Sequence, residues 1–350
     1  LYAKVWRPDA TYSYLTDRTG TASQSPPSSL TAINDHTNIR KDGLYTNFTP
    51  YWTPATAGNN WTAQPTNWQW RETLDLVNTN GMTMQTHDVL DRYNSSKMGY
   101  NNQFVIASTS NAKFEENFFT GFEDYYYNKQ TLSDYPNGHQ DSCYIGLGIG
   151  LQNDNTYNNI PGAMVSNTEA HTGRFSLYLT ASQTAYFAPT TGQTSCLTGL
   201  APLPSPRDSF LLSIWVHVTP PQGMDPLLDF APYAQVRSAF GALVPTGPVI
   251  EGWQRVSGFI SGDAIFSLEA LSPDKSFLTY FDDLRIHPKD ALMVSHVYNS
   301  TTFKLTENLD ENNYFTRYKY NKEGQLELIQ KETEKGILTI QSAYQATQKH

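Results

Sequence analysis

Residues 277–288 read FLTYFDDLRIHP, a run in which aromatic and aliphatic residues surround two adjacent carboxylates, Asp282 and Asp283. Aromatic and branched residues in this arrangement are typical of a β-strand. Strict alternation along such a strand places Phe281 and Asp283 on one face and Asp282 and Leu284 on the other. One acid then lies beside core residues, and a buried acid needs a partner that compensates its charge.

Similar strand-like runs extend on the N-terminal side of this stretch, over residues 115–290. They are parted by Gly, Pro, Asn and Asp at intervals of roughly ten to twenty residues, a pattern that predicts an antiparallel β-sandwich. The runs include SCYIGLGIGL, HTGRFSLYLTAS, DSFLLSIWVHV and GWQRVSGFISG. The first strand of this sandwich is expected in FFTGFEDYYYN, residues 118–128, which holds six aromatic rings and the carboxylates Glu123 and Asp124.

The two flanks have a different pattern, with short alternating runs joined by turns. In residues 1–114, Asn80-Gly81 separates RETLDLV from MTMQTHDVL, a strong signal for a β-hairpin. In residues 291–350, a turn is expected at Asn321 to Gly324, followed by a second at Glu334-Lys335-Gly336. A helix through ELIQKETEK competes with this interpretation on propensity, but the bracketing glycines and the alternation in ILTIQ favour strands. We therefore predict an all-β chain, with hairpin-rich flanks around a sandwich.

Composition limits the classes of partner. Aromatic residues make up 13% of the chain and charged residues only 16%, the formal net charge is −9, and no Lys/Arg cluster occurs. Without a basic patch to neutralise phosphates, a nucleic-acid partner is not expected. No apolar run reaches the roughly 20 residues needed to span a bilayer, so no membrane span is expected. Because the chain opens within a strand-like pattern, we expect it to be a segment of a longer polypeptide.

Catalytic motifs are scarce. The sequence has no Gly-x-Ser-x-Gly, no His-Glu-x-x-His and no phosphate-binding loop. Single histidines such as His217, within SIWVHV, are expected to be structural. A glycosidase needs two carboxylates across a cleft, and nothing in the sequence places two of its acids in that way. Cys143 and Cys196 match no zinc or redox motif, and the sequence leaves open whether they form a disulfide or remain thiols.

A calcium site and a sugar-binding surface are the remaining binding hypotheses. Ca²⁺ takes six to eight oxygen ligands, and three acidic or turn segments would supply them: Gly121 to Asp124, Asn167 to Gly173, and Phe281 to Leu284. Sugar rings would stack on exposed aromatic faces. The aromatic candidates in the sandwich are Trp215, Trp253, Tyr186, Tyr233 and Tyr280, although Trp215, in an apolar run, is expected in the core.

With these segments in view, residues 115–290 resemble the calcium-dependent jelly-roll carbohydrate-binding modules of the galactose-binding-like group. The matching pieces are GFEDY, NTEAHTGRFSLYL, SIWVHV, GWQRVSGFI and FDDLRIHP, in that order. The resemblance implies a jelly-roll fold with one structural Ca²⁺. It implies that the ion is held by Glu123, by the turn from Glu169 to Thr172 and by Asp282.

The flanks resemble the tyrosine-aspartate repeat hairpins of RHS-type proteins, the YD repeats. Residues 318–326, YKYNKEGQL, match the repeat pattern Y-x-Y-D-x-x-G-x-L, with Asn321 in place of Asp. Such flanks around a jelly roll resemble the very large secreted surface proteins of Bacteroidetes. This implies a secreted or cell-surface polypeptide, exported by a type IX secretion machinery, with glycans or other surface proteins as partners.

The expected function is therefore that of a non-catalytic structural or adhesive module of a large surface protein. A carbohydrate-binding module is the first alternative. A glycan-processing enzyme, with Glu123 or Glu269 as the acid, is the second and less favoured one.

Overall fold

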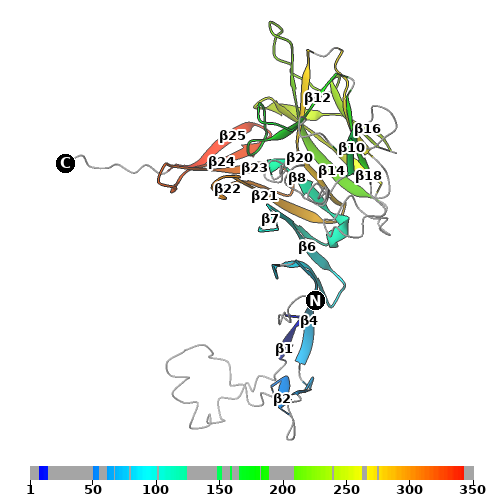
Figure 1. The fold of residues 1–350 in the computed structure, drawn as a ribbon, viewed down its shortest axis with the longest axis vertical. Helices are drawn as coiled ribbons and strands as arrows, with labels where there is room; N and C mark the ends of the chain where they lie inside the picture. Colours follow the sequence, from blue (N-terminus) through cyan, green and yellow to red (C-terminus); the bar gives the residue numbers. More distant parts are fainter. Residues whose placement is uncertain are drawn as a thin grey trace, which may run out of the picture. The chain divides into compact units, whose positions relative to one another are not determined.

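The computed structural model describes two compact units, which we treat separately (Figure 1). The first comprises residues 1–75 and 86–91, and the second residues 76–85 and 92–350. The structure describes residues 8–14, 50–54, 61–66, 68–78, 80–100, 102–123, 148–151, 158–159, 165–181, 183–188, 209–238, 240–261, 266–273 and 276–342. Nearly all of the regular structure in these ranges is β-strand, which confirms the all-β class.

The first unit contains short antiparallel pairs. Strand β1 (Ala10–Tyr14) pairs with β4 (Trp68–Val77), and β2 (Trp52–Pro54) pairs with β3 (Trp61–Ala63). The turn predicted at Asn80-Gly81 is confirmed between β4 and β5 (Thr83–Asp88). Gly81 adopts a φ of 84°, which a residue without a Cβ adopts at no steric cost, and its N–H donates to Asn78 O at 3.0 Å.

The flanks of the second unit form one antiparallel sheet, which we call the host sheet. Its strands lie side by side in chain order. They are β6 (Tyr93–Gly99), β7 (Phe104–Ser110), β21 (Leu292–Tyr298), β22 (Leu305–Leu309), β23 (Phe315–Tyr320), β24 (Leu326–Thr333) and β25 (Gly336–Ser342). Ser110 at the end of β7 pairs with Leu292 at the start of β21. Residues 111–291 therefore leave and re-enter the sheet at one point, and we call them the insert.

The insert begins with the 3₁₀ turn η1 (Phe114–Glu116) and continues as a two-layer sandwich. One sheet has the order β11 (Val165–Ser166), β12 (Ser176–Thr180), β20 (Leu278–Pro288), β14 (Phe210–Thr219), β18 (Trp253–Ile260), β17 (Thr246–Ile250), with β8 (Phe118–Thr120) also on β20. The other has the order β10 (Asn158–Asn159), β9 (Gly148–Leu151), β13 (Thr184–Ala188), β19 (Phe266–Ala270), β15 (Ala234–Ser238), β16 (Gly241–Leu243). Residues of both sheets share one apolar core, among them Leu212 and Leu268, each 0% exposed.

Strand β20 departs from the alternation expected for FLTYFDDLRIHP, and that expectation is wrong. Phe281 and Leu284 both belong to the sandwich core, although they are three positions apart. The cause is a β-bulge: β14 pairs Ser213 with Arg285 but Trp215 with Asp282, so β20 carries an extra residue, and Asp283 has a φ of 51°. The bulge turns Asp283 away from the alternating pattern.

The stretch FFTGFEDYYYN opens the sandwich, and its described part, residues 118–123, is buried except for the half-buried Thr120. Phe118 and Phe122 pack in the sandwich core, whereas Phe119 packs with Met293 and Leu309 in the core of the host sheet. Consecutive rings of one short strand therefore reach two hydrophobic cores. Asp124 and the tyrosines that follow it lie outside the described residues.

The C-terminal prediction of strands over a helix is confirmed by β24 and β25. Gly324 N–H donates to Asn321 O at 2.9 Å in the predicted turn, and Gly336, with a φ of 112°, begins β25 after the second turn.

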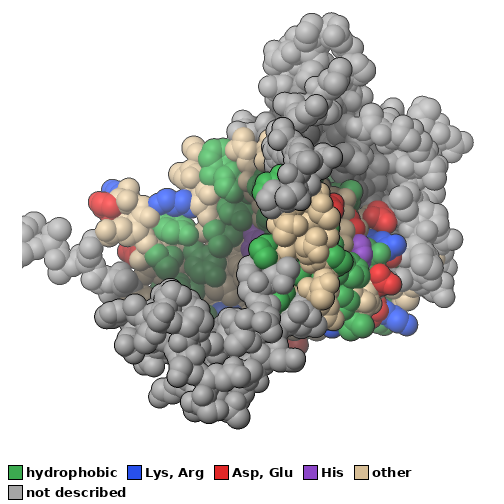
Figure 2. All heavy atoms as spheres, turned by 90° about the horizontal axis from the view of Figure 1, so that it is seen from below, with side chains coloured by type: hydrophobic (Ala, Val, Ile, Leu, Met, Phe, Trp, Pro, Cys, Tyr) green, Lys and Arg blue, Asp and Glu red, His purple; other side chains and the backbone are tan. Residues whose placement is uncertain are grey.

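Cys143 and Cys196 lie outside the described residues, so their pairing stays open. In the described ranges, no helix is long and apolar enough to cross a bilayer. On the face in Figure 2, Lys and Arg side chains lie among Asp and Glu, without an extended basic patch.

Candidate functional site

Glu123 is held by the turn that leads into β12. It is 4% exposed, and its Oε1 accepts hydrogen bonds from Arg174 N at 2.5 Å and Phe175 N at 2.6 Å. Gly173 makes this approach possible: its φ is 60°, and a Cβ at this position would overlap the Glu123 carboxylate. The glycine of HTGRFSLYL is thus required both by backbone conformation and by space.

Asp282 accepts hydrogen bonds from two other amides of the same turn. Its Oδ2 accepts from His171 N at 2.8 Å and Thr172 N at 3.2 Å, and its Oδ1 accepts from Asp283 N at 2.7 Å. Asp282 is 0% exposed and Thr172 1%. The structure therefore brings Glu123, Thr172 and Asp282, three of the residues predicted from the sequence, to one turn.

Burial dominates the electrostatics of this group. Burial, with a smaller contribution from the charges of Glu307 and Asp283, raises the pKa of Glu123 to about 8, against the two hydrogen bonds that lower it. Burial, then the charges of Asp283 and Glu123, raise the pKa of Asp282 well above its usual value. Glu123 Oε2 is buried and has no hydrogen-bond partner among the residues that the structure describes. Such an oxygen is costly unless something occupies its lone pairs.

Glu169 has a different environment. It is half-buried, its backbone carbonyl accepts from Ser176 Oγ at 2.5 Å, and its charge contributes to the raised pKa of Tyr280 after burial. Its carboxylate is not hydrogen-bonded to the Glu123 and Asp282 group in the structure as described, so any contribution to a metal site would come from the backbone of the turn.

The two carboxylates are of the donor type that Ca²⁺ prefers. One of their oxygens, Glu123 Oε2, has no hydrogen-bond partner among the described residues, whereas the turn faces both carboxylates with amide N–H groups. Within the described ranges, no three His, Cys, Asp or Glu side chains are grouped closely enough to hold an ion by themselves. Glu123 and Asp282 would therefore need turn carbonyls and water to complete a coordination shell.

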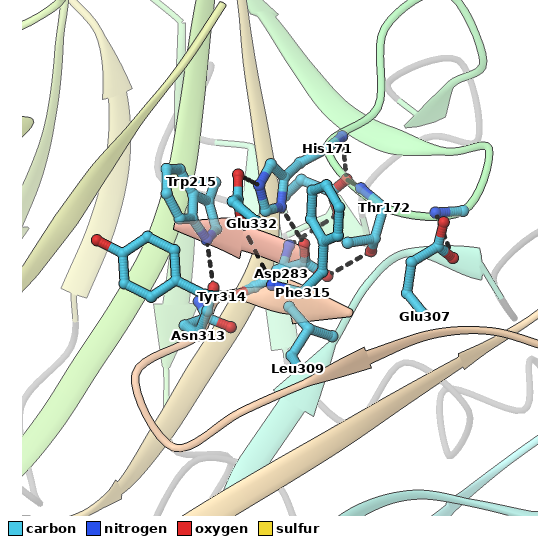
Figure 3. Close-up of polar contacts among 12 residues, drawn as sticks. His171, Thr172, Trp215, Asp283, Glu307, Leu309, Asn313, Tyr314, Phe315 and Glu332 are labelled. Atoms are coloured by element: carbon cyan, nitrogen blue, oxygen red, sulfur yellow. Dashed lines mark hydrogen bonds and ion pairs between the residues drawn. The ribbon is translucent and has the colours of Figure 1, made fainter. Parts of the chain in front are cut away.

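The same turn contacts the host sheet through His171, which is 3% exposed (Figure 3). Its Nδ1 lies 2.7 Å from Asp283 Oδ2 and its Nε2 3.0 Å from Glu332 Oε1. The ring stacks on Trp215 with 4.3 Å between centroids. Burial alone would lower the pKa of His171, but the charges and hydrogen bonds of Glu332 and Asp283 raise it to about 9. His171 is therefore a charged imidazolium between two carboxylates at neutral pH.

A second contact involves the loop before β23. Trp215 Nε1 donates to Asn313 O at 2.7 Å (Figure 3). Asn313 Nδ2 donates to Ser213 Oγ at 3.1 Å and to Asp283 O at 3.0 Å. Trp215 is 1% exposed and Asn313 1%. The indole predicted to lie in the core is indeed buried, but it lies against the host sheet and forms part of the junction.

Two arginines complete this junction. Arg285, on β20 and 1% exposed, donates to the carbonyls of Leu309 at 3.0 Å, Asp310 at 2.5 Å and Met293 at 3.2 Å. Arg317, on β23, donates to His171 O at 2.9 Å and pairs with Glu307 Oε1 at 2.8 Å. Planar guanidinium groups suit this fork-like bonding to several carbonyls.

Neither the His171 to Glu332 pair nor the Arg285 contacts were predicted from the sequence. The partners are separated by 161 positions for His171 and Glu332, and a lone histidine or arginine carries no local signal of such a partner. The position of His171 between an acidic turn and Gly173 was the only available hint.

The aromatic candidates for sugar stacking do not form an exposed platform. Trp253 is 5% exposed and Tyr280 2%, and together with Trp215 they belong to one buried cluster. Tyr233 stacks on Phe277 with 5.4 Å between centroids. The side chain of Tyr186 lies outside the described part of the structure.

A polar group does occur on the outward face of β15 and β19. Glu269 accepts from Gln235 Nε2, from Arg237 Nε at 3.0 Å and from Ser267 Oγ at 3.0 Å. Val236 and Leu268 on the same strands point into the sandwich core. Carboxylate, guanidinium, amide and hydroxyl groups thus meet at Glu269, where the Arg237 side chain is 58% exposed but Gln235 and Ser267 are buried.

No protein-family model matches the chain, and no curated protein matches it. Among solved structures, the chain is similar to the CBM22-1 xylan-binding domain from Paenibacillus barcinonensis Xyn10C, with 16% identity, a TM-score of 0.22, and coverage of 35% of this chain and 78% of that one. The C-terminal family 22 carbohydrate binding module of Clostridium thermocellum Xyn10B gives 14%, 0.22, 36% and 79% for the same quantities.

A β-1,2-glucanase from Parabacteroides distasonis is also similar, with 14% identity and a TM-score of 0.24 over 53% of this chain. The match spans 35% of the glucanase chain. At TM-scores this low, none of the three similarities carries an argument about the site, which rests on the residues above.

Proposed function

We propose that this chain is a non-catalytic structural module, in which the inserted sandwich is held in a fixed orientation on the host sheet. The observation that carries the proposal is the double bonding of the turn at residues 171–173. Its amides bond Asp282 of the sandwich, while His171 and Gly173 bond Glu332 and Glu307 of the host sheet.

The polar bonds of the junction fix one orientation of the sandwich on the host sheet and do more than hold the two parts together. Apolar contacts, such as those of Phe119, are non-directional. The buried His171 and Arg285 bonds have defined geometry, and breaking a buried ion pair on one side costs about 3 to 5 kcal/mol. A sandwich tilted on the host sheet would leave these charges unpaired, so one orientation is selected.

We further propose that one Ca²⁺ stabilises the turn by binding Glu123 and Asp282. The support is the unpartnered Glu123 Oε2 and the raised pKa of both buried acids. A bound cation would compensate two negative charges that burial otherwise disfavours.

The calcium proposal is tested by thermal unfolding of the whole chain in Ca²⁺ and in chelator. We expect a higher melting temperature in Ca²⁺, because a ligand that binds only the folded state stabilises it. The Asp282→Asn variant should lose this difference. The matched control Asp225→Asn, which changes an exposed acid, should keep it. Equal melting temperatures of the wild type in both conditions would eliminate the ion.

Glycan binding is a second candidate function, favoured by the Glu269 group. Its carboxylate, guanidinium and amide are the polar groups that recognise sugar hydroxyls. Binding on a glycan array that is lost in Glu269→Gln, but kept in the exposed control Glu251→Gln, would support it. If a glycan binds equally to both variants, this face is not the site.

The sequence resemblance suggests the kind of longer protein that contains this module and where that protein is located. We propose that it belongs to a secreted or cell-surface polypeptide of the RHS type, with other surface proteins or glycans as neighbours. Detection of the native polypeptide on intact cells by surface proteolysis tests this, and a purely intracellular signal would contradict it.

A further inference from the structure

The hairpin of β2 and β3, in the first unit, presents two tryptophans to solvent. In its register, Trp52 pairs with Ala63 and Pro54 pairs with Trp61. Residues directly opposite each other in an antiparallel pair share a face, and so do residues two apart along a strand. Trp52 and Trp61 therefore lie on one face of the hairpin as diagonal neighbours, and they are 55% and 64% exposed.

A connected set of packed rings in this unit involves other residues. Tyr51, just before β2, contacts Tyr12 on β1 with 4.8 Å between ring centroids and Trp68 on β4 with 5.8 Å. Trp68 in turn contacts Tyr14, with 5.1 Å between centroids. These four rings join the hairpin to the β1–β4 pair. The two exposed tryptophans are not needed for that contact and have most of their surface in water.

The packed rings also orient Trp52. Tyr51 meets the ring of Trp52 nearly at right angles, with 5.1 Å between centroids and 79° between planes. Gln64 N–H donates to Tyr51 O at 2.6 Å, which joins the end of β3 to the start of β2. A side chain that is held in place before its ligand arrives loses little entropy on binding. Trp52 is thus both exposed and supported from behind, as a binding residue requires.

The composition of this segment indicates the chemistry of its ligand. Residues 43–70 contain no Asp, Glu, Lys, Arg or His. Apart from the rings, the polar side chains described on the hairpin are neutral, those of Thr53, Thr62, Gln64 and Thr66. Nucleic acids and anionic membranes bind through Lys and Arg, which this segment lacks. A neutral sugar offers an apolar face to a ring, and its hydroxyls bond neutral hydroxyl and amide groups.

We propose that the hairpin face formed by Trp52 and Trp61 is a binding site for neutral polysaccharides, with a sugar ring stacked on each indole. Diagonal neighbours on one face of a hairpin lie roughly 7–8 Å apart, so both indoles contact a single polysaccharide chain. The site lies within the first unit and uses none of the residues that carry the functions proposed above. It is therefore tested independently of them.

Affinity electrophoresis of the full chain tests the site. Native gels would each contain one neutral polysaccharide, namely xylan, galactomannan, xyloglucan, a β-1,3-glucan or dextran. We expect at least one of them to retard the wild type. The dissociation constant should rise about 2- to 12-fold in Trp52→Ala and in Trp61→Ala, the contribution of one aromatic contact. The control is Leu90→Ala, which removes a side chain of the same unit that is 68% exposed and should leave binding unchanged.

Two further variants separate ring stacking from general apolar contact. Trp61→Phe keeps a flat aromatic face, whereas Trp61→Leu keeps apolar area without a ring. A stacked sugar predicts that the phenylalanine variant retains more affinity than the leucine variant. Because Trp61 is 64% exposed, both variants should fold, and melting temperatures equal to that of the wild type would verify this. If Trp61→Leu binds as tightly as the wild type, the indole ring is not the contact and the proposal is refuted.

The remaining outcomes distinguish this site from the face of the sandwich that contains Glu269. Glu269→Gln should leave binding at the tryptophans unchanged. Retardation that is lost in Glu269→Gln but kept in Trp52→Ala and Trp61→Ala would refute the site and support glycan binding by the sandwich. Retardation by none of the neutral polysaccharides would also refute it. Binding only to polygalacturonate, to phosphatidylcholine vesicles or to a polyproline peptide would assign the face to a different partner and contradict the proposal.

Discussion

Trp215→Phe is the substitution that tests the junction most selectively, because it keeps an aromatic ring and removes the indole N–H. Trp215 Nε1 donates to Asn313 O at 2.7 Å in a region where both residues are 1% exposed. Leaving that carbonyl buried without a donor costs about 1 to 3 kcal/mol. Reducing the stack with the charged His171 ring, 4.3 Å away, removes about 0.5 to 1.5 kcal/mol more.

The expected loss is therefore about 1.5 to 4.5 kcal/mol of unfolding free energy. Urea unfolding followed by far-UV circular dichroism measures it as a lower transition midpoint with an unchanged slope. Trp61→Phe is the control, since Trp61 is 64% exposed and its change should stay within about 0.5 kcal/mol. If Trp215→Phe shifts the midpoint no more than Trp61→Phe does, the indole bond does not hold the junction and the reasoning fails.

Three further predictions concern the turn and its charges. Gly173→Ala should lower the melting temperature more than Gly223→Ala does: both have positive φ, but only at Gly173 would a Cβ meet the Glu123 carboxylate, whereas nothing lies within 4 Å of Gly223. Arg285→Lys should cost about 2 kcal/mol in urea unfolding, because one ammonium cannot replace a guanidinium that reaches three carbonyls. In chelator, the melting temperature should fall between pH 6 and pH 9. The pKa of Glu123 is raised to about 8 and that of His171 to about 9, so the folded state binds more protons than the unfolded state over this range and loses stability as they dissociate. Ca²⁺ should reduce this decline, and a flat or rising profile in chelator would contradict the assignment of both groups.

Local sequence signals were sufficient for the fold class and for several turns. Asn80-Gly81, Asn321 to Gly324 and the alternation around Gly336 all predicted hairpins that the structure contains. These features depend on a few consecutive residues, whose conformational preferences act in the same way in any context. The prediction of a strand rather than a helix over residues 326–333 also rested on local signals, because glycines bound the run on both sides.

Glu123, Thr172 and Asp282 lie at one turn, because the first strand, the turn and the last strand of the insert are adjacent in the sandwich. Their binding of Ca²⁺ stays a prediction. The bulge at Asp283 was missed. A non-glycine residue with positive φ is uncommon, and the sequence gives no sign of it.

The junction was beyond sequence reasoning for a different reason. His171 and Glu332, like Trp215 and Asn313, are partners only because the insert leaves and returns to the host sheet between Ser110 and Leu292. That topology places distant segments together, and no periodicity or propensity records it. His171, like the other single histidines expected to be structural, is one of the residues through which the sandwich contacts the sheet.

The central claim, a sandwich held in one orientation on the host sheet, is tested most directly by an electron-electron distance measurement. Spin labels would be placed at Gln222 of the insert and Lys322 of the host sheet, both exposed, with Cys143 and Cys196 replaced by serine. We predict a single narrow distance distribution in Ca²⁺. A broad distribution spanning many separations would show that the sandwich moves freely on the sheet and would contradict the account.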